Sequence, residues 1–182
     1  MTRARLVACA VMIVLLAACG STPTSSSSLP ATDLQPKGMT ITGVPVIRVV
    51  DGDTLHVNVD GEDVTIRLIG IDTPETVKTD SPIECFGPEA SDFAKSVLDG
   101  QQVTLEFDES QGRTDKYGRT LAYVWVELAD GGRALMNLAA VEGGFAEEKQ
   151  YGPARFAWQT ELRRAEDAAR AAGTGLWGAC TS

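Results

Sequence analysis

The sequence predicts an α+β protein in which helices pack on a small antiparallel β-barrel. Segments with strand patterns come first along the chain, and helical segments are interleaved later. The 182 residues are 43% hydrophobic and 23% charged, which is typical of one globular domain with a real core. The chain shows no internal repeat, so we expect a single folded unit.

Five segments have the β-branched content or alternation of strands. They lie at 41–50, 55–59, 64–71, 103–107 and 121–128. The turn Asp60-Gly61 separates the second segment from the third and predicts a β-hairpin. His56 alternates with Leu55 and Val57, so we expect it on the solvated face of the hairpin without a catalytic role. It is the single histidine, which excludes HExxH zinc sites and multi-histidine clusters.

Three segments have helical patterns. The first opens at Gly87-Pro88, where proline suits the first helical position, and it ends at Asp99-Gly100. The second covers 134–142. The third covers 155–172, and one core-facing stripe at helical spacing is predicted there, formed by Trp158, Leu162, Ala165 and Ala169.

The N-terminus has the features of a targeting segment. Arg3 and Arg5 precede an uncharged apolar stretch over 6–18. Its helix would be roughly 20 Å long, too short for a hydrocarbon core of about 30 Å, so we predict a signal peptide over 1–18. Leu16-Ala17-Ala18-Cys19 resembles the bacterial lipobox, in which the cysteine is acylated. The alternative is an ordinary secretory signal followed by a chance cysteine.

Residues 19–38 are predicted to form the lipidated Cys19 and a Ser/Thr/Pro-rich tether with too little apolar content to join a core. Residues 39–182 are predicted to form the folded domain. We therefore expect an extracytoplasmic protein held at the cell membrane by a lipid anchor. Without Arg3 and Arg5, 14 Lys and Arg face 25 Asp and Glu, a net charge of −11. Such an acidic chain repels nucleic acid at long range, so any phosphate chemistry must rest on a local site.

Two cysteines belong to the predicted domain, Cys85 and Cys180. In an oxidising compartment they are most simply a disulfide, which would stabilise so long a loop by roughly 4 to 5 kcal/mol in the chain-entropy model. The alternative is two buried free thiols. The chain contains no CxxC, which argues against a structural zinc site or a thioredoxin-type role.

Three polar clusters interrupt the strand patterns, at 51–54, 72–76 and 115–119. A carboxylate at a strand end can hold a hard cation through oxygen, and arginine offers a two-pronged donor to phosphate. Carboxylates for a metal, another for a base and two arginines are the groups that phosphodiester hydrolysis needs. Each cluster alone could equally be a turn or a helix opening.

In this order the clusters resemble the staphylococcal nuclease (thermonuclease) family. The likeness runs from about residue 47 to 177, and the matching segments are 50–54, 66–68, 71–76, 86–91, 113–119 and 121–123. The resemblance implies a five-stranded OB-type antiparallel β-barrel with three packed α-helices. It also implies a Ca²⁺-dependent endonuclease that cleaves DNA and RNA with little sequence preference and leaves 3′-phosphate ends.

The resemblance also assigns a metal site. Asp53 and Asp72 match the metal carboxylates, and Thr73 would lend its backbone carbonyl. Asp51 has no equally clear role and could order water or shape its turn.

Three further residues match catalytic positions. Glu75 matches the general base for the attacking water, Arg67 the arginine that grips the scissile phosphate, and Arg119 the one beside the leaving 5′ oxygen. Because these side chains and Asp72 act on charge rather than packing, we expect alanine at Asp72, Arg67 or Arg119 to leave the fold intact.

The chain departs from the family pattern in two places. The loop over 77–85 has mixed charges in place of lysines, and after the second helix only Tyr151 is a candidate for stacking on a base. We therefore expect a monomer with weak affinity for nucleic acid and a salt dependence equivalent to roughly two or three phosphates. Two alternatives stay open: a nucleic-acid or ligand-binding module that does not cleave, and an envelope protein whose Ca²⁺ site is structural.

Overall fold

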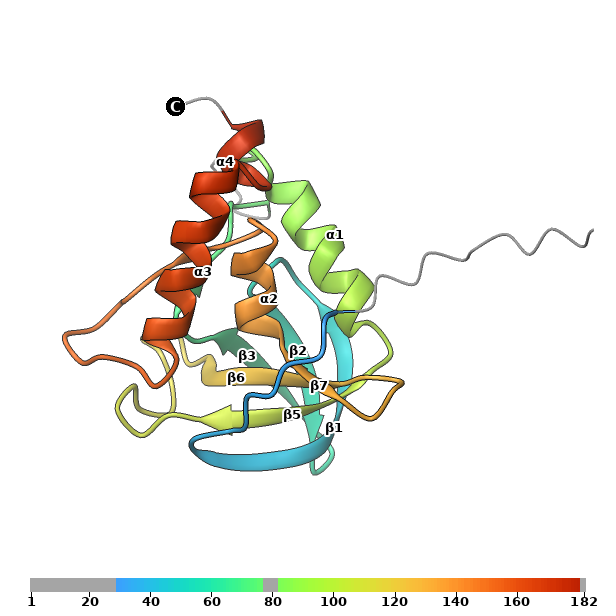
Figure 1. Cartoon of the computed structure of the whole chain (residues 1–182). Coiled ribbons are helices and arrows are strands. Elements are labelled where there is room, and N and C mark those ends of the chain that lie inside the picture. The colour runs from blue at the N-terminus through green and yellow to red at the C-terminus, as the bar shows by residue number, and fades with distance from the viewer. Residues whose placement is uncertain (1–28, 77–81, 181–182) are drawn as a thin grey trace, which may run out of the picture.

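The computed structural model describes residues 29–76 and 82–180; the predicted signal peptide, Cys19 and most of the tether lie outside the described residues. A β-barrel forms one end of the domain, and the helices cover its other end (Figure 1). The barrel strands are β1 (Met39–Val49), β2 (Thr54–Val59), β3 (Glu62–Leu68), β5 (Gln102–Phe107) and β6 (Thr120–Glu127).

The barrel strands follow the order β3-β2-β1-β5-β6, and β3 then pairs with β6 to close the ring. The first four pairings are antiparallel, whereas β3 and β6 are parallel, with Arg67 opposite Leu121. A closed ring with an odd number of strands cannot alternate direction throughout, so the expected barrel requires one parallel pairing. Register shifts in β1 at Ile41/Val44 and Val46/Arg48 let this strand bend and pair with both β2 and β5.

Three shorter strands extend the sheets. β7 (Arg133–Leu135) continues the barrel sheet beside β6, and β4 (Ile71–Asp72) pairs with β8 (Glu147–Glu148). The helix predicted over 134–142 therefore begins later, because Ala134 and Leu135 pair with β6 instead.

Four helices complete the domain: α1 (Gly87–Leu98), α2 (Met136–Glu142), α3 (Gln159–Ala172) and the short α4 (Leu176–Ala179). α3 begins four residues later than predicted, because the backbone N–H of Ala157 donates to the carboxylate of Asp108 and holds that segment against a barrel loop. The stripe predicted on this helix is confirmed: all four of its side chains are buried. Within the described residues, no helix is long and apolar enough to cross a membrane.

The core joins the barrel interior to the helices through a buried polar centre. Trp125 and Trp158 meet edge to face with ring centroids 5.5 Å apart. Their indole N–H groups both donate to Oε2 of Glu106, at 2.8 and 3.1 Å, and Glu106 is fully buried. These bonds satisfy the polar edges of two large core rings, which would otherwise be costly to bury.

Residues 29–38, predicted to be part of the tether, lie against the domain. Leu29 and Leu34 pack on the core, and the backbone N–H groups of Lys37 and Gly38 donate to Oε1 of Glu106. The expectation that nothing before residue 39 joins the core therefore does not hold for these ten residues. Two leucines and one buried carboxylate are enough to dock them.

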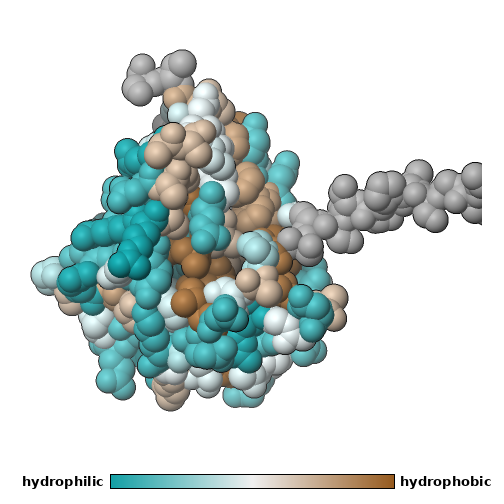
Figure 2. Space-filling view, viewed as in Figure 1, coloured by the Kyte–Doolittle hydropathy of each residue, from teal (hydrophilic) through white to brown (hydrophobic). Residues whose placement is uncertain are grey.

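The surface of the domain reflects the packing of the helices. Figure 2 shows hydrophobic residues gathered between the helices on one face, with a hydrophilic surface over the outer side of α3.

Cys85 and Cys180 form a disulfide with Cα atoms 5.9 Å apart, which confirms that prediction. His56 lies half-buried in the β2–β3 hairpin, where its ring contacts Arg48 and Asp63.

Candidate functional site

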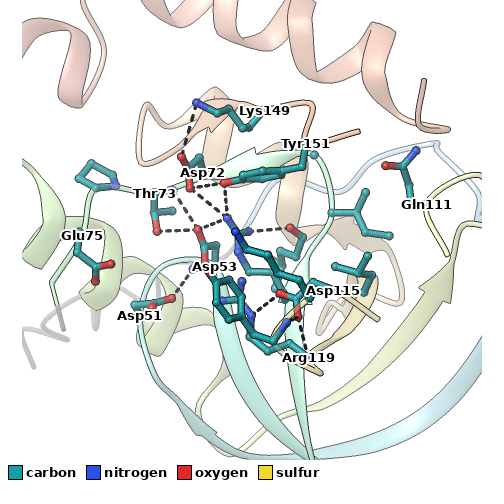
Figure 3. A pocket seen from close by; sticks show the side chains of 18 residues that line it. Asp51, Asp53, Asp72, Thr73, Glu75, Gln111, Asp115, Arg119, Lys149 and Tyr151 are labelled. Carbon is teal, nitrogen blue, oxygen red and sulfur yellow. Dashed lines mark hydrogen bonds and ion pairs between the residues drawn. The ribbon is translucent and has the colours of Figure 1, made fainter. Parts of the chain in front are cut away.

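One cavity of about 690 Å³ opens at the ends of β3 and β4, and side chains from several loops line it (Figure 3). All the residues assigned to metal, catalysis or substrate from the sequence lie on its walls. They are Asp53, Arg67, Asp72, Thr73, Glu75, Arg119 and Tyr151, joined by Asp51. The three polar clusters therefore meet in space.

The turn between β1 and β2 brings Asp51 and Asp53 to the cavity. The N–H of Asp53 donates to Oδ1 of Asp51 at 3.1 Å, which tightens the turn. Gly52 lies so close to Thr73 that an added Cβ would stand 2.7 Å from Thr73 Cγ2. This contact requires glycine at position 52 and packs the first polar cluster directly on the second.

Arg67 is the penultimate residue of β3 and lies buried at the centre of the site. Its Nη1 donates to the backbone carbonyls of Leu68 and Ile71, at 2.8 and 2.9 Å. Its Nη2 forms ion pairs with Oδ2 of Asp53 and Oδ1 of Asp72, at 3.0 and 3.1 Å. Arg67 thus supports the local backbone as well as carrying charge, so alanine at this position should cost stability as well as activity.

Asp53 is the most buried carboxylate of the cavity wall. Burial raises its pKa to about 6, although the Arg67 guanidinium opposes this shift. Thr73 donates to Oδ2 from both its N–H and its hydroxyl, at 3.1 and 3.2 Å, and Thr54 donates to Oδ1. The hydrogen bonds fix the carboxylate in one orientation, facing Asp72.

The residues present fit a hard cation. Asp53 and Asp72 converge on one positively charged nitrogen of Arg67, which shows that a cation can lie between the two carboxylates. The atoms that would bind a metal here are oxygen atoms, the ligands that Ca²⁺ prefers. Among residues 29–76 and 82–180, no three acidic, histidine or cysteine side chains cluster at metal-binding distances. A cation at this site would therefore be held by two carboxylates, the Thr73 carbonyl and water.

Arg119 reaches the cavity from the loop before β6. Its Nε forms an ion pair with Oδ2 of Asp115 at 2.7 Å, and its N–H donates to Oδ1 of the same carboxylate. Although burial opposes it, these bonds hold the pKa of Asp115 below its usual range. Glu75 lies on the wall of the cavity opposite Tyr151, and Asp51 and Thr73 lie between these two residues (Figure 3).

Tyr151 enters the site through a pairing of two very short strands. β8 aligns Glu147 opposite Asp72, and the N–H of Lys149 donates to the carbonyl of Gly70, so the chain after β8 passes over Asp72. The Tyr151 hydroxyl donates to Asp72 and accepts from Arg67. Burial, followed by the hydrogen bond to Asp72, raises the pKa of Tyr151.

Several cavity residues had no role predicted from the sequence. Lys149 places Nζ 4.0 Å from Oδ2 of Asp72, and Lys116 and Tyr117 lie on the wall beside Arg119. A signal was present for Lys116 and Tyr117, which belong to the matched segment 113–119, whereas Lys149 follows a two-residue strand and had no such signal.

The fold and site together define a class: an OB-type barrel with helices on one end and a cavity of carboxylates and guanidinium groups at its strand ends. The family model described as staphylococcal nuclease homologue matches residues 65–179. The thermonuclease of Staphylococcus hyicus is 42% identical over 132 residues, covering 72% of this chain and 73% of that protein. The chain belongs to the staphylococcal nuclease homologue family.

Two other relatives match over less of their own length. The thermonuclease of Staphylococcus intermedius is 47% identical over 108 residues, 59% of this chain and 60% of the relative. An uncharacterized protein of Bacillus anthracis is 37% identical over 147 residues, 78% of this chain and 63% of the relative. The chain thus spans less than two thirds of these two relatives.

Proposed function

We propose that this protein is a Ca²⁺-dependent endonuclease that hydrolyses phosphodiester bonds of DNA or RNA. The observation that carries the proposal is that Arg67, Arg119 and Glu75 line the same cavity as the oxygen-bearing side chains of Asp53, Asp72 and Thr73. Relatives named thermonuclease support the same reaction class.

Each group has a distinct task in the proposed reaction. Arg67 and Arg119 neutralise the charge that builds up on the phosphate oxygens. Glu75 accepts a proton from the attacking water as the water oxygen bonds to phosphorus. The bond from phosphorus to O5′ breaks, O5′ takes a proton from solvent water and leaves as a 5′-hydroxyl, and a 3′-phosphate remains. Asp53, Asp72 and the Thr73 carbonyl would hold Ca²⁺, which supplies positive charge and orients the phosphate.

The contacts of Arg67 hold its guanidinium in place before substrate binds. Arg67 already shares its Nη2 among Asp53, Asp72 and Tyr151, so a phosphate oxygen would replace one of these acceptors on a guanidinium that is already held in place. A guanidinium fixed before binding needs little rearrangement in the transition state.

A cleavage assay tests the proposal. The chain lacking residues 1–19 is mixed with a fluorescently labelled single-stranded oligonucleotide, first with Ca²⁺ and then with chelator, beside Glu75→Gln as control. We expect cleavage that requires Ca²⁺ and falls by about 10² to 10⁴-fold in Glu75→Gln. Binding without cleavage would favour a binding module, and Ca²⁺-dependent stability with neither binding nor cleavage would favour a structural Ca²⁺ site.

We also propose that Cys19 anchors the protein outside the cytoplasm through lipid. The support is the succession of Arg3 and Arg5, the apolar stretch 6–18 and the lipobox-like 16–19. Cys19→Ala should release the protein from the membrane fraction or block its maturation. An unchanged membrane-bound product would contradict the anchor.

A further inference from the structure

The backbone at Glu75 is fastened to Glu84 by two reciprocal hydrogen bonds. The N–H of Glu75 donates to Oε2 of Glu84 at 3.0 Å, and the N–H of Glu84 donates to the carbonyl of Glu75 at 3.0 Å. Glu84 lies outside the cavity wall, so it touches the site only through Glu75. The two ends of the loop between them are thereby tied together.

The start of α1 backs this junction. The N–H of Gly87 donates to the carbonyl of Glu84 at 3.0 Å. An added Cβ on Gly87 would stand 3.0 Å from the carbonyl oxygen of Glu75 and 2.8 Å from Cγ2 of Thr76. Phe86 stacks on Phe145 with centroids 5.7 Å apart, which holds the helix start in place. The Glu75 backbone therefore rests on α1 with no spare space.

The disulfide is the covalent part of the same support. Cys85 follows Glu84 directly and is bonded to Cys180, the residue after α4. α4 is itself docked, because the N–H of Leu176 donates to the carbonyl of Gly144 at 2.9 Å. Cys85 is exposed, so a small reductant can reach the bond.

We propose that Glu84 is a positioning residue for Glu75 and that the Cys85–Cys180 disulfide makes this positioning, and hence turnover, dependent on redox state. The inference rests on the proposed function, in which Glu75 is the general base. A dithiol reductant delivers two electrons and two protons to the disulfide, giving two cysteine thiols, and is itself oxidised to a cyclic disulfide.

Loss of the Glu84 hydrogen bonds or of the disulfide should lower kcat and leave KM nearly unchanged. A displacement of a catalytic group by about 1 Å can cost on the order of 10²-fold in rate. Substrate binding depends on the cavity cations and Tyr151, which contact neither Glu84 nor the disulfide. A general loss of folding would instead reduce the active fraction.

The first arm compares Glu84→Ala, Glu84→Gln and the control Glu89→Ala, which removes an equal charge from the exposed side of α1. We expect kcat to fall about tenfold or more in Glu84→Ala with KM within about twofold. Glu84→Gln keeps an acceptor oxygen and should recover most of the rate. A normal kcat in Glu84→Ala overturns the positioning role.

The second arm treats the wild type and Glu84→Ala with dithiothreitol, with circular dichroism confirming that both stay folded at the assay temperature. Reduction should lower kcat about tenfold in the wild type and less than twofold in Glu84→Ala. Reduction and the substitution both remove the same support of the Glu75 backbone, so their effects should not add. Equal fold-losses in the two proteins, or none in the wild type, overturn the redox link.

Hydrogen exchange at the Glu75 amide separates this inference from the proposed function. Protection of that amide should fall in Glu84→Ala and in the reduced wild type, whether or not the protein cleaves nucleic acid. Unchanged protection overturns the inference. An active wild type with normal Glu84 variants refutes only the inference, and an inactive wild type with lost protection refutes only the nuclease.

Discussion

The Tyr151 hydroxyl donates a hydrogen bond of 2.6 Å to Oδ1 of Asp72. The hydroxyl oxygen of Tyr151 also accepts a hydrogen bond of 2.9 Å from Nη2 of Arg67. Tyr151 therefore occupies, by its hydroxyl, the position where a proposed metal carboxylate and a proposed phosphate-binding arginine meet. The sequence suggested only that its ring could stack on a base.

Tyr151→Phe should strengthen Ca²⁺ binding. The hydroxyl competes with the cation for Oδ1 of Asp72, so its removal leaves this oxygen with Arg67 as its one remaining side-chain donor among the described residues. We expect the Kd for Ca²⁺, measured by calorimetry without substrate, to fall about threefold to tenfold, equivalent to a net hydrogen bond of roughly 0.5 to 1.5 kcal/mol. Tyr117→Phe, the same change at an exposed cavity residue, should leave this Kd unaltered. A weaker affinity in Tyr151→Phe would mean that the hydroxyl orients Asp72 for the cation.

The parts of the site that were predictable come from short contiguous segments. Asp72, Thr73 and Glu75 follow one apolar run, and the resemblance of segment 71–76 to the staphylococcal nuclease family assigned their chemistry. The placement of Lys149 was not predictable, since it depends on the two-residue strands β4 and β8, which have no periodicity to detect. Long-range pairing of such short strands is decided by the packing around them.

The same distinction applies to the fold. The stripe on α3 was visible because four positions share one helical face. Docking of residues 29–38 was not, because it depends on Glu106, a carboxylate buried in the barrel whose backbone partners lie far away in the sequence. The alternation of polar and apolar residues along a strand cannot show that one of its carboxylates is buried and binds a distant segment.

Arg67→Ala and Arg119→Ala should both abolish most activity but differ in stability. Arg67 is buried, and its loss leaves the Asp53 carboxylate without its counter-ion and removes a donor from two backbone carbonyls, so we expect a cost of about 3 to 5 kcal/mol. Arg119 is partly exposed and forms its ion pair with nearby Asp115, so its loss should cost less than about 1 kcal/mol. Urea unfolding followed by tryptophan fluorescence measures both. Equal midpoints would show that Arg67 does not support the backbone.

Asp108→Asn should flatten the acid dependence of stability. Burial opposes ionisation of Asp108, but hydrogen bonds from Ala157, Ser110 and Tyr123 outweigh it and hold its pKa below the usual range. The stabilisation is complete above the unfolded pKa of about 4 and is lost as the pH falls through the lower folded pKa. Thermal melting should therefore separate wild type and variant at pH 7, and the gap should close below about pH 4.

Glu109→Gln is the matched control for that measurement. Glu109 is the next residue and is exposed, so its neutralisation changes the charge of the same loop without touching these hydrogen bonds. Its melting curve should follow the wild type at every pH. A gap between Asp108→Asn and wild type that persists unchanged to pH 2.5 would mean that the carboxylate charge is not what holds the loop.

The salt dependence of substrate binding should exceed the value expected from the sequence. Two or three phosphates were expected because only Arg67, Arg119 and a bound cation were assigned to phosphate, yet Lys116 and Lys149 line the same cavity. Single-stranded nucleic acid gives a slope of about −0.7 per phosphate neutralised, so two further lysine contacts change the expected slope from between about −1.4 and −2.1 to between about −2.8 and −3.5. The distant acidic surface should weaken the affinity most at low salt, where its long-range field is least screened.

The test uses a Glu75→Gln background, so that the oligonucleotide is bound with Ca²⁺ but not cleaved. Fluorescence anisotropy between low and physiological salt gives the slope, and Lys149→Ala should reduce its magnitude by about 0.7. Arg164→Ala, which removes an exposed cation of α3 away from the cavity, should lower it by much less. If Lys149→Ala and Arg164→Ala have the same effect, the salt dependence reflects the overall field of the protein and not phosphate contacts inside the cavity.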